Sequence, residues 1–510
     1  MAKRKSSGGK EPPTPANERP ATPAVTYTRE DLQRDLLRGL ITEPLLGKLQ
    51  DPRAQEVEFH IIISLNENYP GGTDAARTLV NQAIDDLDPP ATRRGGTATY
   101  VFAIMTGRQI LKLAALYRSW IGTQGRKVGP IYRVWEDAEV RACVNRSIST
   151  IKADACHRAF CSMGEGIVWA VLDSGIDDRH PHFGKEQERL VKDLSKNFVD
   201  PAGSPFDDAY GHGTHVAGII AGSWEEKDES KRQVMAVEAL IEGTDQAETH
   251  LQKLAAISGI APQARLVSCK VLDERGVGRT SAILEALEHI LKVNEYGRWP
   301  KIHGVNISLG YDFNPRWFGC GQSPLCVEVD RLVKSGVVVV VAAGNSGFSA
   351  VGLNVSGTNE LGYRDVSIND PGNAELAITV GATHRDMPHK YGVSFFSSRG
   401  PTGDGRPKPD LVAPGERIVS CATGSFRDKV VASAALPPDT EVLYLEQSGT
   451  SMAAPHVSGA IAAFLSVRRE FIGRPEKVKE IFLENTIDLR RERAFQGAGL
   501  LDLLKVMQAV

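Results

Sequence analysis

The sequence has few cysteines and no long hydrophobic segment, and each scarcity argues against a class of protein. Its 510 residues include seven cysteines, an odd number without dense spacing, which excludes a disulfide-rich secreted scaffold. Cys320 and Cys326 are close enough in sequence to bridge a small loop, but free thiols are expected in a reducing compartment. No run of about 18 apolar residues occurs, so no membrane span is expected.

An excess of positive charge is also missing. The formal net charge is −3, which gives no indication of a nucleic-acid partner. Residues 1–27 are rich in proline and polar side chains and are expected to form a disordered head. The basic start at Lys3–Lys5 has no apolar core after it, so no secretory signal peptide is expected and a cytoplasmic location is predicted. A targeting role for the basic start is the alternative.

The length predicts two domains, because 510 residues exceed what one typical core organises. Residues 56–143 alternate between expected strands and amphipathic helices, which predicts a small α+β domain. The strands are expected at 57–64, 97–105 and 131–140, and the helices at 73–87 and 108–120. Residues 144–162 have weak periodicity and are interpreted as a junction.

Residues 163–510 alternate strands with helices and predict a doubly wound α/β domain, with a parallel sheet covered on both faces. The strands are expected at 167–172, 265–272, 305–309, 337–342 and 377–380, and the helices at 214–222, 280–294, 326–335, 451–468 and 475–484. A charged insert at 224–258 contains two apolar periodic pieces and is interpreted as a projecting helical hairpin.

Three short motifs in this second region carry an aspartate, a histidine and a serine. They are DSGID at 173–177, GHGTHVAG at 211–218 and GTSMAAPHVSG at 449–459. A serine hydroxyl is a weak nucleophile that needs an adjacent base. In such a set Ser451 attacks, His212 takes its proton, and Asp173 orients the imidazole.

These motifs, in this order, resemble those of the subtilisin-like serine proteases (subtilases, peptidase S8 family). The resemblance covers residues 165–510 well and implies a serine endopeptidase that works through an acyl-enzyme. A non-catalytic scaffold or binding protein with the same fold is the alternative, although four retained site residues argue against it.

The resemblance also implies an oxyanion donor and a substrate-binding edge. Asn345 follows the strand-like segment 337–343 and is expected to present its side-chain amide to the oxyanion, together with the Ser451 backbone N–H. Substrate is expected to pair as an added strand and to fill an apolar pocket. The residues expected to bind it are Ser308, Leu309, Gly310, Ala342, Ala343 and Gly344.

Residues 56–143 resemble the inhibitory prodomain of subtilases in order and placement, which implies a ferredoxin-like fold and a zymogen. An unrelated small α+β domain is the alternative. The expected partners are therefore protein or peptide substrates and the chain's own N-terminal domain, as an intramolecular inhibitor. The bond cut on maturation is expected between Ala142 and Ser162.

No cofactor is required by this chemistry, and no metal ligands are assigned. The insert 224–258 stands where many subtilases carry a calcium-binding loop, so their high-affinity calcium site is doubtful here. Calcium elsewhere stays possible at Asp200, Asp207 and Asp208, although a solvated acidic loop is the favoured interpretation. The insert is interpreted as a solvated decoration, with a docking surface for a partner protein as the alternative.

The segment 396–415 is a further close match to the family, and it is interpreted as structural support. Four of its charged residues are expected to form an internal ion-pair set rather than to catalyse. They are Arg399, Asp404, Arg406 and Asp410.

Overall fold

The computed structural model divides the chain into two compact units, Met1–Val140 and Arg141–Val510. Each unit has its own hydrophobic core, and the two are described separately. The residues that the structure describes are 37, 39–122, 128–137, 146–184, 189–226, 228, 233–240, 247–353, 359–434 and 441–510.

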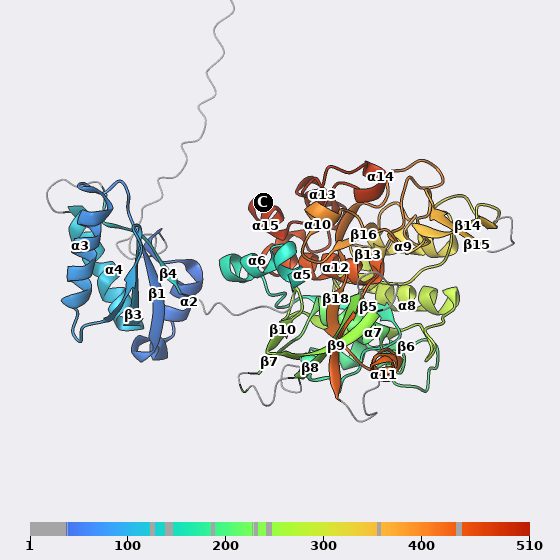
Figure 1. The fold of residues 1–510 in the computed structure, drawn as a ribbon, viewed down its shortest axis with the longest axis horizontal. Helices are drawn as coiled ribbons and strands as arrows, with labels where there is room; N and C mark the ends of the chain where they lie inside the picture. The colour runs from blue at the N-terminus through green and yellow to red at the C-terminus, as the bar shows by residue number, and fades with distance from the viewer. Residues whose placement is uncertain are drawn as a thin grey trace, which may run out of the picture. The chain divides into compact units, whose positions relative to one another are not determined.

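The first unit is a four-stranded antiparallel sheet in the order β2-β3-β1-β4, and α3 and α4 pack on one face (Figure 1). The strand and helix order β1-α3-β2-β3-α4-β4 is the ferredoxin-like arrangement. Strand β2 was not expected, because its sequence TRRGG has no apolar alternation. The elements are α2 (Glu43–Leu49), η1 (Pro52–Glu56), β1 (Glu58–Leu65), α3 (Gly72–Asp85), β2 (Thr92–Gly96), β3 (Tyr100–Thr106), α4 (Gly107–Gly122) and β4 (Ile131–Glu136).

The two faces of this sheet differ in burial. Ile61 and Ile63 on β1 are fully buried in the core beneath the helices. Ile62 points to the opposite face, because successive strand residues alternate. There it pairs across the strands with Phe102 on β3 and Trp135 on β4, and Trp135 is 43% exposed. The sheet therefore carries an apolar face that the described part of this unit leaves partly open.

The second unit contains a seven-stranded sheet in the order β17-β16-β13-β12-β5-β11-β6, and every neighbouring pair is parallel (Figure 1). The prediction of a doubly wound parallel sheet is confirmed. The strands are β5 (Val168–Asp173), β6 (Lys196–Asn197), β11 (Arg265–Lys270), β12 (Gly304–Ile307), β13 (Val338–Ala342), β16 (Ile378–His384) and β17 (Leu411–Glu416).

Both faces of this sheet are covered, as strand β5 illustrates. Trp169 and Val171 belong to the core cluster that also contains side chains of α7 and α12, whereas Ala170 and Leu172 belong to the cluster that contains side chains of α8 and α9. The helices of this unit are α5 (Arg146–Thr150), α6 (Ala153–Phe160), η3 (Pro181–Phe183), η4 (Lys192–Leu194), α7 (His212–Ile220), α8 (Thr280–Val293), η6 (Glu295–Gly297), α9 (Pro324–Lys334), α10 (Pro388–Tyr391), α11 (Gly424–Ser433), α12 (Thr450–Val467), η7 (Arg469–Phe471), α13 (Pro475–Glu484), α14 (Arg493–Gln496) and α15 (Leu503–Gln508).

The prediction of a helical hairpin at 224–258 is wrong, because the insert forms strands. Strand β8 pairs in parallel with β19 and antiparallel with β9, which extends a smaller sheet to the order β18-β19-β8-β9. Adjacent Met235 and Ala236 are both buried, in different clusters, so both faces of β8 are covered and a two-residue alternation is absent. The remaining strands are β7 (Ser223–Glu225), β8 (Gln233–Leu240), β9 (Ala247–Leu254), β10 (Ala256–Ser258), β14 (Phe348–Leu353), β15 (Asn359–Tyr363), β18 (Ile418–Cys421) and β19 (Val442–Gln447).

The segment interpreted as a junction, 144–162, contains two helices that pack within the second unit. Ile151, between α5 and α6, is fully buried, and the backbone N–H of Leu503 donates to its carbonyl at 3.0 Å. Lys152 and Asp502 form an ion pair between the same regions. The described part of this segment, 146–162, is therefore part of the domain core rather than a linker.

The ion-pair set expected at 396–415 forms only in part. Arg406 pairs with Asp404, but the Arg399 guanidinium stacks between two aromatic rings, each with its centroid 4.3 Å away. Those rings belong to Tyr363 and Phe495. The expectation that Arg399 belongs to an ion-pair set is therefore not met, because stacking takes its place among the described residues.

Asp410 is the centre of a buried cluster with two lysines. Its carboxylate pairs with Lys408, which is 3% exposed, and with Lys479 at 3.1 Å, and it accepts the Thr379 N–H at 2.7 Å. Burial alone would raise the pKa of Asp410, but the two lysine charges hold it below its ordinary value. Removing one member of such a set leaves buried charges uncompensated.

We therefore expect Asp410→Ala to lower the free energy of unfolding of the second unit by about 3–5 kcal/mol. Asp404→Ala is the matched control, because the Asp404–Arg406 pair is partly exposed and an exposed pair contributes about 0–1 kcal/mol. The measurement is urea unfolding of both full-length variants. Equal losses of unfolding free energy in the two variants would contradict the conclusion that the buried Asp410 cluster stabilises the domain more than the Asp404–Arg406 pair does.

Candidate active site

The candidate residues lie at one edge of the seven-stranded sheet. Asp173 is the last residue of β5, Ser308 follows β12 directly, and Asn345 follows β13 by three residues. In open parallel sheets, the carboxyl ends of the strands form the edge where ligands bind. The strands that follow β5 in the chain lie on both sides of it, with β6 and β11 on one side and β12 and β13 on the other. Asp173, at the end of β5, therefore lies at a topological switch point of the sheet.

His212 begins helix α7 and is bonded to Asp173. The distance from Nδ1 of His212 to Oδ1 of Asp173 is 2.7 Å, and the aspartate side chain is 1% exposed. The same Oδ1 accepts the N–H of Ser174 at 2.8 Å. Burial alone would lower the pKa of His212, but the charge and hydrogen bond of Asp173, together with the charge of Asp208, raise it above its ordinary value.

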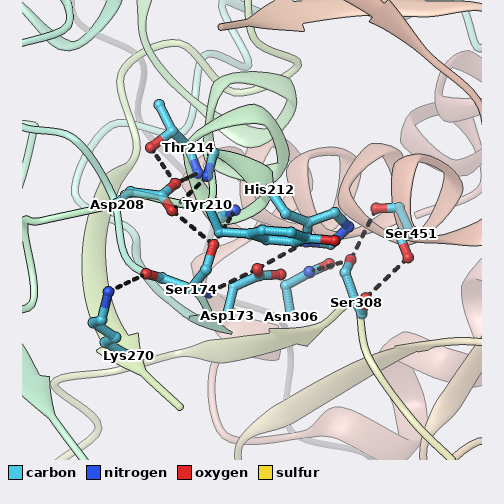
Figure 2. Close-up of polar contacts among 12 residues, drawn as sticks. Asp173, Ser174, Asp208, Tyr210, His212, Thr214, Lys270, Asn306, Ser308 and Ser451 are labelled. Carbon is cyan, nitrogen blue, oxygen red and sulfur yellow. Dashed lines mark hydrogen bonds and ion pairs between the residues drawn. The ribbon is translucent and has the colours of Figure 1, made fainter. Parts of the chain in front are cut away.

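Ser451 is the second residue of α12, an apolar helix that packs against the sheet. Figure 2 shows the His212 ring between Asp173 and Ser451, while the Ser451 hydroxyl donates to the carbonyl of Ser308 at 2.9 Å. By length and composition α12 is the one helix of the described residues that could cross a membrane, but 83% of it is buried inside the domain.

A proline inside α12 frees a backbone acceptor at the serine. Pro455 has no N–H, so it cannot make the helical hydrogen bond to the carbonyl four residues earlier, which belongs to Ser451. The hydroxyl of Ser308 donates to that carbonyl instead, at 2.9 Å. The loop after β12 and the start of α12 are thereby joined twice, through the Ser308 hydroxyl and through the Ser308 carbonyl.

Asn345 is exposed, and its side-chain oxygen is held by the start of α12. Oδ1 of Asn345 accepts the Thr450 N–H at 2.9 Å and the Thr450 hydroxyl at 3.0 Å. Because both of these bonds use the oxygen, they fix the amide so that its Nδ2 is the end available as a donor.

The chain is similar to known proteins over most of its length. Residues 164–500 match the model of the Subtilase family. Serine protease AprX of Bacillus subtilis (strain 168) is 31% identical over 375 residues, which make up 72% of this chain and 72% of AprX. The chain belongs to the subtilase family. Subtilisin E of the same organism is 30% identical over 370 residues, covering 72% of this chain and 73% of that protein. The Intracellular serine protease of Paenibacillus polymyxa is 29% identical over 389 residues, covering 75% and 92%.

This subtilase is therefore a subtilisin-like serine endopeptidase, and its substrates are proteins or peptides. The residues expected to bind substrate have different environments. Gly310 is exposed and Gly344 is partly exposed, whereas the side chains of Ala342 and Ala343 are buried and the Ser308 side chain is 2% exposed. The side chains at these three positions are therefore nearly closed to solvent.

The segment Asn369–Asp370 lies beneath both glycines and was not identified from the sequence. A Cβ at Gly344 would lie 2.6 Å from Cγ of Asn369, and one at Gly310 would lie 2.5 Å from the carbonyl oxygen of Asp370. Gly344 also has a φ of +106°, which favours glycine. No local motif marks these contacts, because residues distant in sequence make them.

A buried chain of hydrogen bonds, a polar relay, joins Ser458, Asn306 and Ser308 and could not be identified from the sequence. The Ser458 hydroxyl donates to Oδ1 of Asn306 at 2.9 Å, and Nδ2 of Asn306 donates to the Ser308 hydroxyl at 2.8 Å. All three side chains are nearly inaccessible to solvent. The relay orients the Ser308 hydroxyl toward the Ser451 carbonyl, so it helps to set the position of Ser451.

The interpretation of Asp208 as part of a solvated acidic loop is wrong, since its side chain is buried beside His212. Asp200 and Asp207 are exposed. Among the described residues, no group of three or more His, Cys, Asp or Glu side chains could hold a metal ion. The described cysteines, including Cys320 and Cys326, are free thiols.

Proposed function

We propose that this endopeptidase cleaves internal peptide bonds with Asp173, His212 and Ser451 as its catalytic residues. The observation that carries the proposal is the 2.7 Å bond between buried Asp173 and His212 at the sheet edge, with Ser451 at the start of α12 beside it. When substrate binds, the Ser451 hydroxyl hydrogen turns from the Ser308 carbonyl to Nε2 of His212. The Ser451 oxygen then attacks the scissile carbonyl carbon as His212 takes the proton.

Asp173 keeps the proton on Nδ1 of His212 and stabilises the imidazolium that forms. The imidazolium gives its proton to the leaving amine, and an acyl-enzyme on Ser451 remains. Water then attacks the ester with His212 again as the base, which releases the new carboxylate and restores the hydroxyl. The chain's own residues supply every proton transfer in this sequence, and the proposed mechanism requires no cofactor.

Asn345 is proposed to stabilise the oxyanion together with the Ser451 backbone N–H. Support comes from the two hydrogen bonds of Thr450, which orient the amide so that Nδ2 is the available donor. A fixed donor at the developing charge costs no reorganisation during the reaction.

Replacing Asn345 by alanine is expected to lower kcat by about 10²–10³-fold, with KM little changed, because the lost bond acts mainly on the transition state. Initial rates on a chromogenic peptide give both constants. Thr450→Val is the companion variant: it keeps the amide but loosens one of its two anchors, so it should give a smaller loss. A kcat for Asn345→Ala within threefold of the unaltered chain would contradict the assignment.

The proposed internal cleavage through Ser451 is tested with peptides blocked at both ends. An endopeptidase cleaves them internally, whereas an exopeptidase needs a free terminus. Full-length protein and its Ser451→Ala variant are incubated with such a peptide, and the products are identified by mass spectrometry. Internal cleavage by the first alone is expected. Equal cleavage by both would overturn the proposal, and cleavage by neither, even after the N-terminal unit has been removed, would favour the non-catalytic scaffold.

The N-terminal unit is further proposed to inhibit the enzyme until it is removed, as a prodomain does. Support comes from the partly exposed apolar sheet face around Ile62, Phe102 and Trp135, because such a face is typical of an interaction surface. The peptide bond cleaved on maturation, expected within 142–162, is proposed to lie before Arg146. Bonds within α5 and α6 belong to packed helices and are poor sites for cleavage.

A charge placed on that sheet face is expected to activate the full-length protein before the chain is cleaved. Full-length Phe102→Glu, confirmed intact by mass spectrometry, should hydrolyse a blocked peptide about tenfold or more faster than the intact unaltered chain, since a lost contact of about 1.4 kcal/mol is a factor of ten. Leu116→Glu is the control, because Leu116 is exposed on α4 at the other face of the sheet. Equal activation by both variants, or by neither, would contradict inhibition through the sheet face.

The protein is also proposed to act in the reducing interior of the cell. Two similar proteins are named intracellular serine proteases, from Paenibacillus polymyxa and Bacillus subtilis (strain 168), and the described cysteines are free thiols. Recovery of the protein mainly outside intact cells would contradict this. At the insert 224–258 a docking surface for a partner protein stays the alternative to a solvated decoration. That no cofactor is required also stays a prediction, which a chelator would test by leaving the rate of hydrolysis unchanged.

A further inference from the structure

We propose that Asp208 is a positioning residue for this reaction, which joins the loop that carries Asp173 to the helix that carries His212 and sets a second negative charge near the imidazole. The inference rests on the proposed catalytic roles of Asp173 and His212. Asp208 lies four residues before His212 and is 3% exposed. Figure 2 shows its carboxylate between Ser174 and Thr214, on the side of His212 away from Ser451.

The Asp208 carboxylate is fully used as a hydrogen-bond acceptor. Its Oδ1 accepts the Ser174 hydroxyl and the Gly211 N–H, both at 2.8 Å. Its Oδ2 accepts the Thr214 N–H at 2.8 Å and the Thr214 hydroxyl at 2.6 Å. Four donors directed at two oxygens are what an ionised carboxylate requires, since it can only accept.

Ser174 connects Asp208 to Asp173. While its hydroxyl donates to Asp208, its backbone N–H donates at 2.8 Å to Oδ1 of Asp173, the oxygen that also holds His212. The Ser174 hydroxyl also accepts the Gly213 N–H at 2.9 Å, so it contacts helix α7 as well. A shift of Asp208 therefore moves the donor that fixes the catalytic carboxylate.

Asp208 also completes the start of α7. The residue before the helix is Gly211, which has no side chain to cap the first backbone donors. Its φ is +98°, and a Cβ there would lie 2.2 Å from the Thr423 carbonyl oxygen, so a polar capping side chain has no room. Asp208 accepts the N–H groups of Gly211 and Thr214 in its place, and its negative charge is favourable at a helix N-terminus.

Lys270 holds the two acidic segments together. It is the last residue of β11, in register with Asp173 on β5, and is 7% exposed. Its Nζ donates to the Ser174 carbonyl at 2.9 Å and to the Asp207 carbonyl at 2.6 Å. These carbonyls belong to the residue after Asp173 and the residue before Asp208.

The groups that face His212 leave an excess of negative charge. Asp173 and Asp208 both raise the pKa of His212, against the effect of burial. His215, one turn further along α7, is buried and has a pKa of about 3, so it stays neutral at neutral pH. The Tyr210 ring lies 6.4 Å from the imidazole, and Asp177 is paired with Arg179. Burial raises the pKa of Asp208 itself, against the effect of its four hydrogen bonds.

The test is the pH dependence of kcat/KM for a blocked peptide, measured on Asp208→Asn and on Asp207→Asn. Because Asp207 is adjacent in sequence and exposed, its variant removes the same charge without the contacts. For Asp208→Asn we expect kcat/KM at the plateau to fall about 100-fold, the scale of a misplaced catalytic group. The midpoint of the acid limb, which reports His212 in the free enzyme, should move to lower pH. Asp207→Asn should change kcat/KM at the plateau by less than threefold, and it should not shift the midpoint of the acid limb detectably.

Two further variants separate geometry from charge and protect the test against misfolding. Ser174→Ala breaks the link to Asp173 while the Asp208 charge remains, so its rate should fall with the midpoint unchanged. Thr214→Val removes one donor to Asp208 and should act in the same direction, but less. If Asp208→Asn does not fold, an unaltered rate in both of these variants overturns the inference.

An Asp208→Asn enzyme with the rate and midpoint of the unaltered chain would overturn the inference. So would a lower rate without any shift of the midpoint, since only a structural contribution would then remain. Failure of the proposed function looks different, because the unaltered chain, with its N-terminal unit removed, would then show no hydrolysis and no adduct of a serine-reactive phosphonate on Ser451.

Discussion

Replacing Ser451 by alanine is expected to abolish peptide hydrolysis, with a fall in kcat of about 10⁶-fold, the scale of a lost nucleophile. The oxygen that forms the acyl-enzyme is removed, so His212 and Asp173 have no hydroxyl to activate. Only oxyanion stabilisation and substrate binding remain, which leave a residual acceleration of about 10³–10⁴ over water. The measurement is the initial rate on a doubly blocked chromogenic peptide.

Ser466→Ala is the matched control for that experiment. Ser466 lies on the same helix, and its hydroxyl donates to the Ala463 carbonyl at 2.7 Å, away from the sheet edge where Asp173 and His212 meet. Its variant should keep the full rate. Retained hydrolysis in Ser451→Ala, after contaminating protease has been excluded by inhibitor titration, would contradict the assignment of the nucleophile.

Replacing Asp173 by asparagine is expected to lower kcat by about 10⁴-fold while the fold is kept. The asparagine amide can present an N–H to Nδ1 of His212, which moves the imidazole proton to Nε2, where the ring must accept from Ser451. The buried charge that stabilises the imidazolium is lost as well, and with it the pKa of His212 should fall.

The control for the Asp173 variant is Asp178→Asn. Asp178 lies in the same loop, with a side chain 30% exposed that pairs with Lys192 at the surface. That variant should change kcat less than twofold. Equal losses in the two variants, or a kcat for Asp173→Asn within tenfold of the unaltered enzyme, would contradict the role of Asp173.

The catalytic-domain strands could be predicted because burial on both faces gives them continuous apolar sequences. The predicted strand 337–342 corresponds to β13 (Val338–Ala342), and 265–272 to β11 (Arg265–Lys270). The prediction of a helical hairpin at 224–258 was wrong for a related reason. Val234–Ala236 reads equally as a helix or a buried strand, and only its pairing with β19, more than 200 residues later, decides between them. Tertiary pairing of this kind leaves no local signal.

Candidate site residues could be predicted where a short motif surrounds them, and not where their place in the site depends on distant contacts. Asp173 and His212 were found this way, and their hydrogen bond is present in the structure. Asp208 lies in an acidic loop that resembles a solvated one, because nothing in its neighbours reveals that Ser174 and Thr214 turn toward it. Asn306 was likewise hidden, since its partners Ser308 and Ser458 come from a strand end and a helix.

The most direct test of the account is to locate the covalent adduct of a serine-reactive phosphonate. Full-length protein is incubated until its N-terminal region is shed, treated with the phosphonate, and examined by intact and peptide mass spectrometry beside Ser451→Ala. We expect one adduct, on Ser451, in a fragment that begins before Arg146, and none in the variant, which should also stay full length. Hydrolysis that continues with Ser451 unlabelled, or an adduct on another residue, would contradict it.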